Sequence, residues 1–92
     1  MKSPKIVKKS VVFSLNMPEA ESVLLAGSFT NWGENPLPLK KQKSGVWKVN
    51  VRLEPGTYEY KFIVDGNWVN DPECSMRNPN PYGGENCVIC VE

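Results

Sequence analysis

The sequence predicts an all-β fold, an antiparallel sandwich of about seven to eight short strands. Short runs of alternating apolar and polar residues recur along the chain, and no run keeps the periodicity of a helix. Clusters of Gly, Pro, Asn and Asp separate these runs, as is typical of turns. The chain of 92 residues is 40% hydrophobic and 23% charged, which fits one small globular domain.

The first part of the chain is expected to supply three strands, after a flexible tail over residues 1–9. The domain itself is expected over residues 10–92. The runs "SVVFSL" and "SVLLAGSF" flank a turn, "MPEAE". A loop with prolines and a basic cluster, "LKKQK", then precedes the most regular run, "VWKVNVRL". The side chains expected to face the core are Val11, Phe13, Leu15, Val23, Leu25, Trp47, Val49, Val51 and Leu53.

The second part of the chain continues the alternation. In "TYEYKFIV" one face carries Tyr58, Tyr60, Phe62 and Val64, and Lys61 belongs to the opposite face. The pair Asp65-Gly66 is a strong hairpin signal and leads into "NWVNDP". A long loop rich in Pro, Gly and Asn then precedes a closing strand, "CVICVE".

Composition argues against several classes of function. The formal net charge is +1, which does not favour nucleic-acid binding, and we interpret the lysine clusters as solvated charge. There is no histidine, the commonest general base and zinc ligand, so we expect no cofactor or metal. No apolar run approaches the length of a membrane span or a signal-peptide core, so we expect a cytoplasmic protein with no membrane partner.

The three cysteines are expected to be free thiols. On one strand, Cys87 and Cys90 would point to opposite faces with Cα atoms about 10 Å apart, beyond the roughly 7 Å that a disulfide allows. The same spacing makes a shared metal ion difficult. A bridge from Cys74 to one of the other two is the main exception to this expectation.

Two of the three tryptophans suggest a binding surface. Trp47 follows the inward alternation and is expected in the core, whereas Trp32 and Trp68 lie in or beside turns. Each could fold back as a lid on the sandwich, but together they suggest two exposed aromatic platforms. Lys61 and the amides of Asn31, Asn67, Asn70 and Asn86 are near them in the sequence. Indole rings with polar donors suit sugars, whose apolar C–H faces stack on aromatics while their hydroxyls need polar partners.

The stretches "VLLAGSFTNW", "EPGTYEYKFIVDGNWVNDP" and "ENCVICV" resemble carbohydrate-binding module family 48. Within it, the sequence is similar to the glycogen-binding domain of the AMP-activated protein kinase β subunit, and to early-set domains of isoamylase and branching enzyme. The resemblance extends over about residues 10–92. It implies an immunoglobulin-like early-set sandwich that binds α-1,4-linked glucans without catalysis, alone or beside a glucan-metabolising enzyme or a kinase-type assembly.

The resemblance also implies roles for particular residues. Trp32 and Trp68 match the stacking tryptophans of the family, and Lys61 and Asn86 match its hydrogen-bonding lysine and asparagine. Tyr82 and Gly84 stand where the kinase-type pattern has a leucine and a threonine. Tyr82 would then add a third aromatic contact, whereas Gly84 offers only its backbone. Phe29 is expected to turn inward beside Trp32, and Gly27 and Gly33 to permit the tight turn.

The sequence leaves two other interpretations of the function open. The first is an enzyme, but the acidic residues are scattered, whereas a glycosidase needs two carboxyl groups facing one cleft. The second is a protein-interaction or structural module with little sugar binding of its own. The joint presence of Trp32, Trp68, Lys61 and Asn86 favours glucan binding, because a structural module has no evident need of that set.

Overall fold

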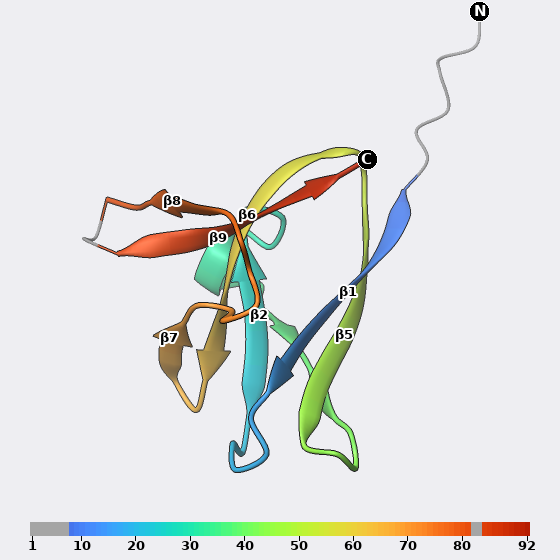
Figure 1. Ribbon diagram of the computed structural model, residues 1–92, viewed down its shortest axis with the longest axis vertical. Helices are drawn as coiled ribbons and strands as arrows, with labels where there is room; N and C mark the ends of the chain where they lie inside the picture. Colours follow the sequence, from blue (N-terminus) through green and yellow to red (C-terminus); the bar gives the residue numbers. More distant parts are fainter. Residues whose placement is uncertain (1–7, 82–83) are drawn as a thin grey trace, which may run out of the picture.

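Two antiparallel sheets face each other in the computed structural model, which describes residues 8–81 and 84–92 (Figure 1). The three-stranded sheet has the order β1-β5-β4, with β1 Lys9–Asn16, β5 Val46–Leu53 and β4 Lys40–Lys41. The larger sheet has the order β3-β2-β6-β9-β8, with β7 also paired to β6. Its strands are β3 Leu37–Pro38, β2 Val23–Gly27, β6 Gly56–Val64, β9 Glu85–Val91, β8 Arg77–Pro79 and β7 Asn67–Val69.

The predicted fold class is confirmed. The strand number is slightly higher than expected, because the loop over residues 30–45 contributes two strands of two residues each, β3 and β4. This loop also contains a short 3₁₀ helix, η1 Trp32–Glu34. Residues 1–7 of the expected tail lie outside the described residues, and Lys9 is already the first residue of β1.

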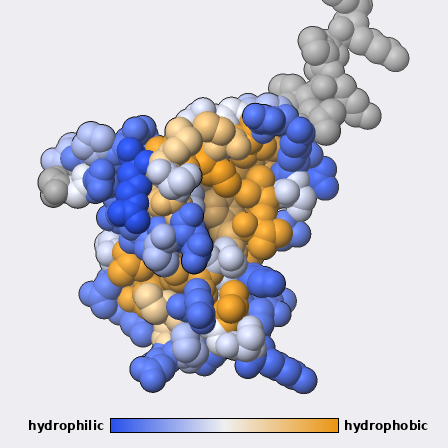
Figure 2. Space-filling model, in the orientation of Figure 1, coloured by the Kyte–Doolittle hydropathy of each residue, from blue (hydrophilic) through white to orange (hydrophobic). Residues whose placement is uncertain are grey.

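The core lies between the sheets. On the face that Figure 2 shows, apolar residues occupy the middle and hydrophilic ones the rim. The alternation read from the sequence is confirmed in β5 and β6. Trp47 is 8% exposed, and its indole Nε1 donates a hydrogen bond to the carbonyl of Met17 at 2.8 Å. Phe62 is completely buried, which follows from the strict period of two along β6.

The turn after β2 differs in its backbone from what we expected. Neither Gly27 nor Gly33 has a positive φ; instead, Asn31 and Trp32 do, both at 56°. Gly27 is required for space, because a Cβ there would lie 2.6 Å from the carbonyl oxygen of Glu59. Phe29 does turn inward, with its ring stacked on that of Phe13 at a centroid distance of 5.6 Å.

The expectation of three free thiols is wrong. Cys74 and Cys87 form a disulfide, with Cα atoms 6.0 Å apart, and Cys90 is free and exposed. The reasoning on Cys87 and Cys90 holds, since these two do not bridge. What the sequence did not reveal is that the chain after β7 returns alongside the first residues of β9, where the Val88 N–H donates to the carbonyl of Met76, and so brings Cys74 to Cys87.

In the part of the chain that the structure describes, no helix is long and apolar enough to cross a membrane. Within the same residues, no three His, Cys, Asp or Glu side chains gather into a group that could hold a metal ion.

Candidate functional site

A pocket of about 710 Å³ opens on the outer face of the larger sheet, at the point along β6 where its paired strand changes from β9 to β7. Residues 56–60 of β6 pair with β9, and residues 62–64 pair with β7, so Lys61 sits at the junction between the two partners. Lys61 faces away from the core, as its place between the buried Tyr60 and Phe62 predicts. The described residues that line the pocket are Trp32, Gly33, Lys61, Trp68, Asn80, Pro81 and Asn86.

Trp32 reaches the pocket from the turn after β2. The buried Thr30 holds this turn, because its hydroxyl accepts a hydrogen bond from the Gly27 N–H at 3.0 Å and lies 2.9 Å from the carbonyl of Trp32. The Asn31 side chain also donates to the carboxylate of Glu34. With Asn31 and Trp32 both in the left-handed region, the chain turns the indole toward the outer face instead of the core.

Trp68 comes from the β6–β7 hairpin. Asp65 and Gly66 form its turn with φ of 48° and 86°, as the Asp-Gly signal predicts. Trp68 lies opposite Ile63 in the ladder, so it shares the outer face with Lys61, and it is 47% exposed.

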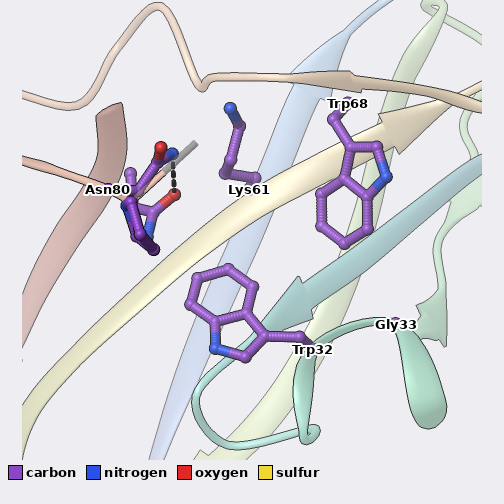
Figure 3. A pocket seen from close by; sticks show the side chains of 7 residues that line it. Trp32, Gly33, Lys61, Trp68 and Asn80 are labelled. Atoms are coloured by element: carbon purple, nitrogen blue, oxygen red, sulfur yellow. Dashed lines mark hydrogen bonds between the residues drawn. The ribbon is translucent and has the colours of Figure 1, made fainter. Parts of the chain in front are cut away.

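The two indoles meet at an angle. Their ring centroids lie 6.5 Å apart, with 47° between the ring planes. In Figure 3 the Lys61 side chain stands between Trp68 and Asn80, and the Trp32 ring lies across from it. A Cβ built on Gly33 would lie 3.6 Å from Cζ2 of Trp68, so this glycine packs closely beside the second indole. The site therefore offers two non-coplanar aromatic surfaces beside one amine.

Asn86 is held by a hydrogen-bonded chain of side chains. It is 9% exposed, and its Oδ1 accepts from Nδ2 of Asn80 at 3.1 Å, the dashed line in Figure 3. Its Nδ2 donates to Oε1 of Glu59, also at 3.1 Å. An amide has two N–H groups and two lone pairs on its oxygen, so one of each remains for another partner. The orientation of the Asn86 amide is thus fixed by its neighbours.

Asp71 anchors the loop that follows β7 to the core. Its buried carboxylate accepts a hydrogen bond from the hydroxyl of Tyr60 at 2.8 Å, and its other oxygen accepts from the N–H of Glu73. Burial, followed by the hydrogen bond and the charge of Asp71, raises the pKa of Tyr60 above its ordinary value. With the Cys74–Cys87 disulfide, this contact anchors residues 71–74 to β6 and β9.

The structure brings together four of the six predicted site residues: Trp32, Lys61, Trp68 and Asn86. Tyr82 lies outside the described residues. Gly84 does not line the pocket, and its N–H and carbonyl are both bonded to Asn80, at 3.0 and 2.9 Å. Roles for any of these residues in sugar contact remain predictions.

Sequence reasoning missed Asn80 and Pro81 and favoured other amides. Of the described asparagines, Asn80 and Asn86 line the pocket, whereas Asn31, Asn67 and Asn70 do not. The signal for Asn80 was the loop sequence "NPNPYGGEN", because an Asn before Pro-containing turns commonly bonds its own backbone a few residues on. Closeness in the sequence was a poor guide, since the site is assembled across strands.

The comparisons place the chain in a family. Residues 10–92 match the family model described as the glycogen recognition site of AMP-activated protein kinase, so the chain belongs to this family of glycogen-recognition domains. It is 43% identical over 72 residues to the protein FLOURY ENDOSPERM 6 of Oryza sativa subsp. japonica, and 45% identical over 85 residues to the phosphoglucan phosphatase LSF1 of Arabidopsis thaliana. These alignments cover 78% and 89% of this chain, but only 13% and 14% of the relatives.

A solved structure agrees on the fold. The maltogenic amylase from S. marinus matches 96% of this chain with a TM-score of 0.74 at 24% identity, over 15% of its own chain. This likeness supports the early-set, immunoglobulin-like sandwich and says nothing of function. The predicted family, and with it the prediction of a glucan-binding module, is thus confirmed at the level of the family.

The expectation of a cytoplasmic protein is contradicted by the relatives. FLOURY ENDOSPERM 6 and LSF1 are both named as chloroplastic proteins. The expectation had rested only on the absence of recognisable targeting residues in this sequence, and such an argument cannot distinguish compartments.

Proposed function

We propose that this domain binds α-1,4-linked glucan without catalysing a reaction, through the pocket on the outer face of the larger sheet. The observation that carries the proposal is the pair of indoles, Trp32 and Trp68, which lie 6.5 Å apart and inclined by 47° beside Lys61. An α-1,4-linked chain curves, so successive rings can stack on surfaces that are not coplanar. A straight β-1,4-linked chain presents its faces in one plane and fits this arrangement poorly.

The polar groups of the pocket have distinct parts in this proposal. Lys61 has no ion-pair or hydrogen-bond partner among the described residues, so its ammonium is available for sugar hydroxyls. Asn86 supplies the N–H and the lone pair that Asn80 and Glu59 leave unused. Tyr82 is proposed as a third aromatic contact, and the backbone of Gly84 contributes only to the shape of the loop. The open pocket and the modest number of polar contacts lead us to expect an affinity of about micromolar to millimolar.

The domain is proposed to act within, or beside, a larger glucan-metabolising protein. The chain spans only a small part of the relatives it matches, one of which is named as a phosphoglucan phosphatase. Another is a β subunit of AMP-activated protein kinase. In such an assembly the domain would hold the partner on its polymeric substrate and leave the chemistry to other parts.

Titration with maltoheptaose and with cellohexaose, followed by tryptophan fluorescence, tests the proposal. We expect saturable quenching or enhancement with maltoheptaose and at least about tenfold weaker binding of cellohexaose, because only the curved chain meets both indoles. Lys61→Met keeps most of the side-chain length but loses the donor, so it should weaken maltoheptaose binding by about 1–2 kcal/mol.

The control for that variant is the melting temperature, which Lys61→Met should leave within about 2 °C of the unmodified protein. Equal affinity for the two oligosaccharides would contradict α-glucan recognition. No binding of either would favour a protein-interaction or structural role for the domain.

A further inference from the structure

The two sheets differ in charge. The strands β1, β4 and β5 contain no acidic residue, and their basic residues are Lys9, Lys40, Lys41, Lys48 and Arg52. The strands of the larger sheet are balanced, with Glu59 and Glu85 against Lys61 and Arg77. Because the whole chain has a net charge of only +1, this difference is a segregation of charge and not a general excess of cations.

Three of these cationic side chains lie on the outer face of the small sheet, with no anionic side chain paired to them among the described residues. Lys40 and Lys48 lie directly opposite each other in the β4–β5 ladder, so their side chains share one face, and Arg52 follows on the same side of β5. None of the three cationic groups has an ion-pair or hydrogen-bond partner among the residues that the structure describes, although the carbonyl of Lys40 accepts a hydrogen bond from Gln42. Like charges directly opposite on a sheet are destabilising, so the pair is held at a cost to the fold.

The neighbouring Lys41 shows what a compensated lysine looks like in the same strand. Its ammonium donates a hydrogen bond to the carbonyl of Pro18 at 2.6 Å and lies 6.0 Å from the ring centroid of Trp47. Lys41 is therefore occupied by the fold itself, whereas the cations on the outer face are not.

A hollow of about 340 Å³ adjoins these cations. It is lined by the apolar Val12 and Val49, by Pro38 from β3 of the larger sheet, by Lys40 and Lys48 and by the amides of Gln42 and Asn50. Val12 is 60% exposed although it lies in the middle of β1, opposite Asn50. The outer positions of β1, β4 and β5 include no aromatic side chain, so this face lacks the stacking surface that sugars or unpaired bases use.

We propose that the outer face of the β1-β5-β4 sheet is a docking surface for an acidic polypeptide segment that carries an apolar side chain between carboxylates. The apolar side chain would enter the hollow beside Val12 and Pro38, and the flanking carboxylates would pair with Lys40, Lys48 and Arg52. Such pairing replaces the repulsion between Lys40 and Lys48 by attraction. This inference is independent of the glucan pocket, which shares no lining residue with the hollow.

Fluorescence anisotropy with a labelled peptide, Asp-Glu-Leu-Asp-Glu-Leu-Asp-Glu, tests the surface on the 92-residue chain. We expect binding that weakens between low salt and about 0.15 M salt. Lys48→Gln should reduce the affinity at least about fivefold, because it removes one charged contact. The control Lys43→Gln makes the same charge change at an exposed turn residue outside the hollow, and should change the affinity less than about twofold.

Two further measurements decide what the face recognises. A peptide with Asn and Gln in place of Asp and Glu should bind at least about fivefold more weakly. If a single-stranded oligothymidylate or vesicles containing phosphatidylserine bind more tightly than the acidic peptide and depend on Lys48, the assignment to a polypeptide is overturned. Equal loss in Lys48→Gln and Lys43→Gln would also overturn it, because that result describes unspecific attraction to charge.

A melting experiment on the same variant provides an independent check. Lys48→Gln relieves the repulsion with Lys40, so it should raise the melting temperature by about 1–3 °C while it weakens peptide binding. A raised melting temperature with unchanged peptide affinity would show a solvated surface without a ligand. An unchanged or lowered melting temperature would show that the cations are not held at a cost, and would count against the proposal.

Discussion

At the residue scale, the position of Trp32 is explained by its backbone. Left-handed φ values for two successive residues other than glycine, Asn31 and Trp32, are uncommon and cost about 1–3 kcal/mol each. The buried Thr30 sustains this turn through its hydroxyl, and the result is an indole directed to the outer face beside Trp68. A tryptophan that served only the core would not need such a turn, as Trp47 on β5 shows.

The three tryptophans should therefore respond differently to truncation. We expect Trp32→Ala and Trp68→Ala each to weaken maltoheptaose binding at least about tenfold, and to change the unfolding free energy by about 1 kcal/mol or less. Trp47→Ala should cost about 3–5 kcal/mol of stability, because it leaves a large cavity and removes the indole hydrogen bond to the carbonyl of Met17. Thermal melts and maltoheptaose titrations on the three variants check this. Should Trp32→Ala unfold the protein as readily as Trp47→Ala, Trp32 would be a structural lid.

The sequence was sufficient to predict which of these side chains face the core and which face outward, but not which residues they contact. The period of two in "VWKVNVRL" and "TYEYKFIV" was sufficient to separate Trp47 and Phe62 from Lys61. The loop sequence could indicate that Asn80 bonds its own loop, but not that its side chain also donates a hydrogen bond to Asn86 in the pocket. That contact depends on the path of the chain between β7 and β9.

At the element scale, the pocket exists because β6 is longer than β7 and β9, the two strands that pair with the same side of it. β9 pairs with residues 56–60 of β6 and β7 with residues 62–64, so on this side of β6 Lys61 pairs with neither strand. The strand itself is evident in the sequence, whereas this exchange of neighbours is not, because register between distant strands is set by tertiary packing. The same fact explains the disulfide that sequence reasoning missed. Cys74 lies in the segment that crosses from β7 to β9.

The Cys74–Cys87 disulfide should contribute measurably to stability. It spans a sequence separation of 13, for which loop-closure entropy predicts about 2–3 kcal/mol. We expect Cys74→Ser to lower the unfolding free energy by about that amount, and Cys90→Ser, at the free and exposed cysteine, by less than about 0.5 kcal/mol. Denaturant unfolding measures both, with alkylation and mass spectrometry to count free thiols. Three alkylated thiols in the untreated protein would show that the bridge does not form.

At the scale of the whole molecule, the sequence was sufficient to predict the fold class, but not the cellular compartment or the distribution of charge between the two sheets. Alternation and turn residues define the sandwich, because its core is built from local periodicity repeated strand by strand. The compartment could not be deduced from these 92 residues. The chloroplastic names belong to relatives of which this chain spans only 13% and 14%. The segregation of charge was also hidden. Lys40 and Lys48 lie eight positions apart in the sequence, and only the β4–β5 ladder places them side by side.

The two proposed surfaces are formed largely by different sheets and share no lining residue, although Pro38, which lines the hollow, belongs to β3 of the larger sheet. The core between them is built of buried, closely packed side chains, and such cores do not deform continuously. We therefore expect the affinity for the acidic peptide to change less than about twofold when maltoheptaose is present at saturation, and Trp32→Ala to leave peptide binding unaltered. Anisotropy titrations with and without maltoheptaose measure this, with Lys48→Gln as the variant that should lose the peptide and keep the sugar. A change in peptide affinity of about fivefold or more, in either direction, would contradict this independence. It would mean that the two ligands share a surface or that the sandwich transmits binding across its core. The domain would then not be a passive bridge between a glucan and a protein.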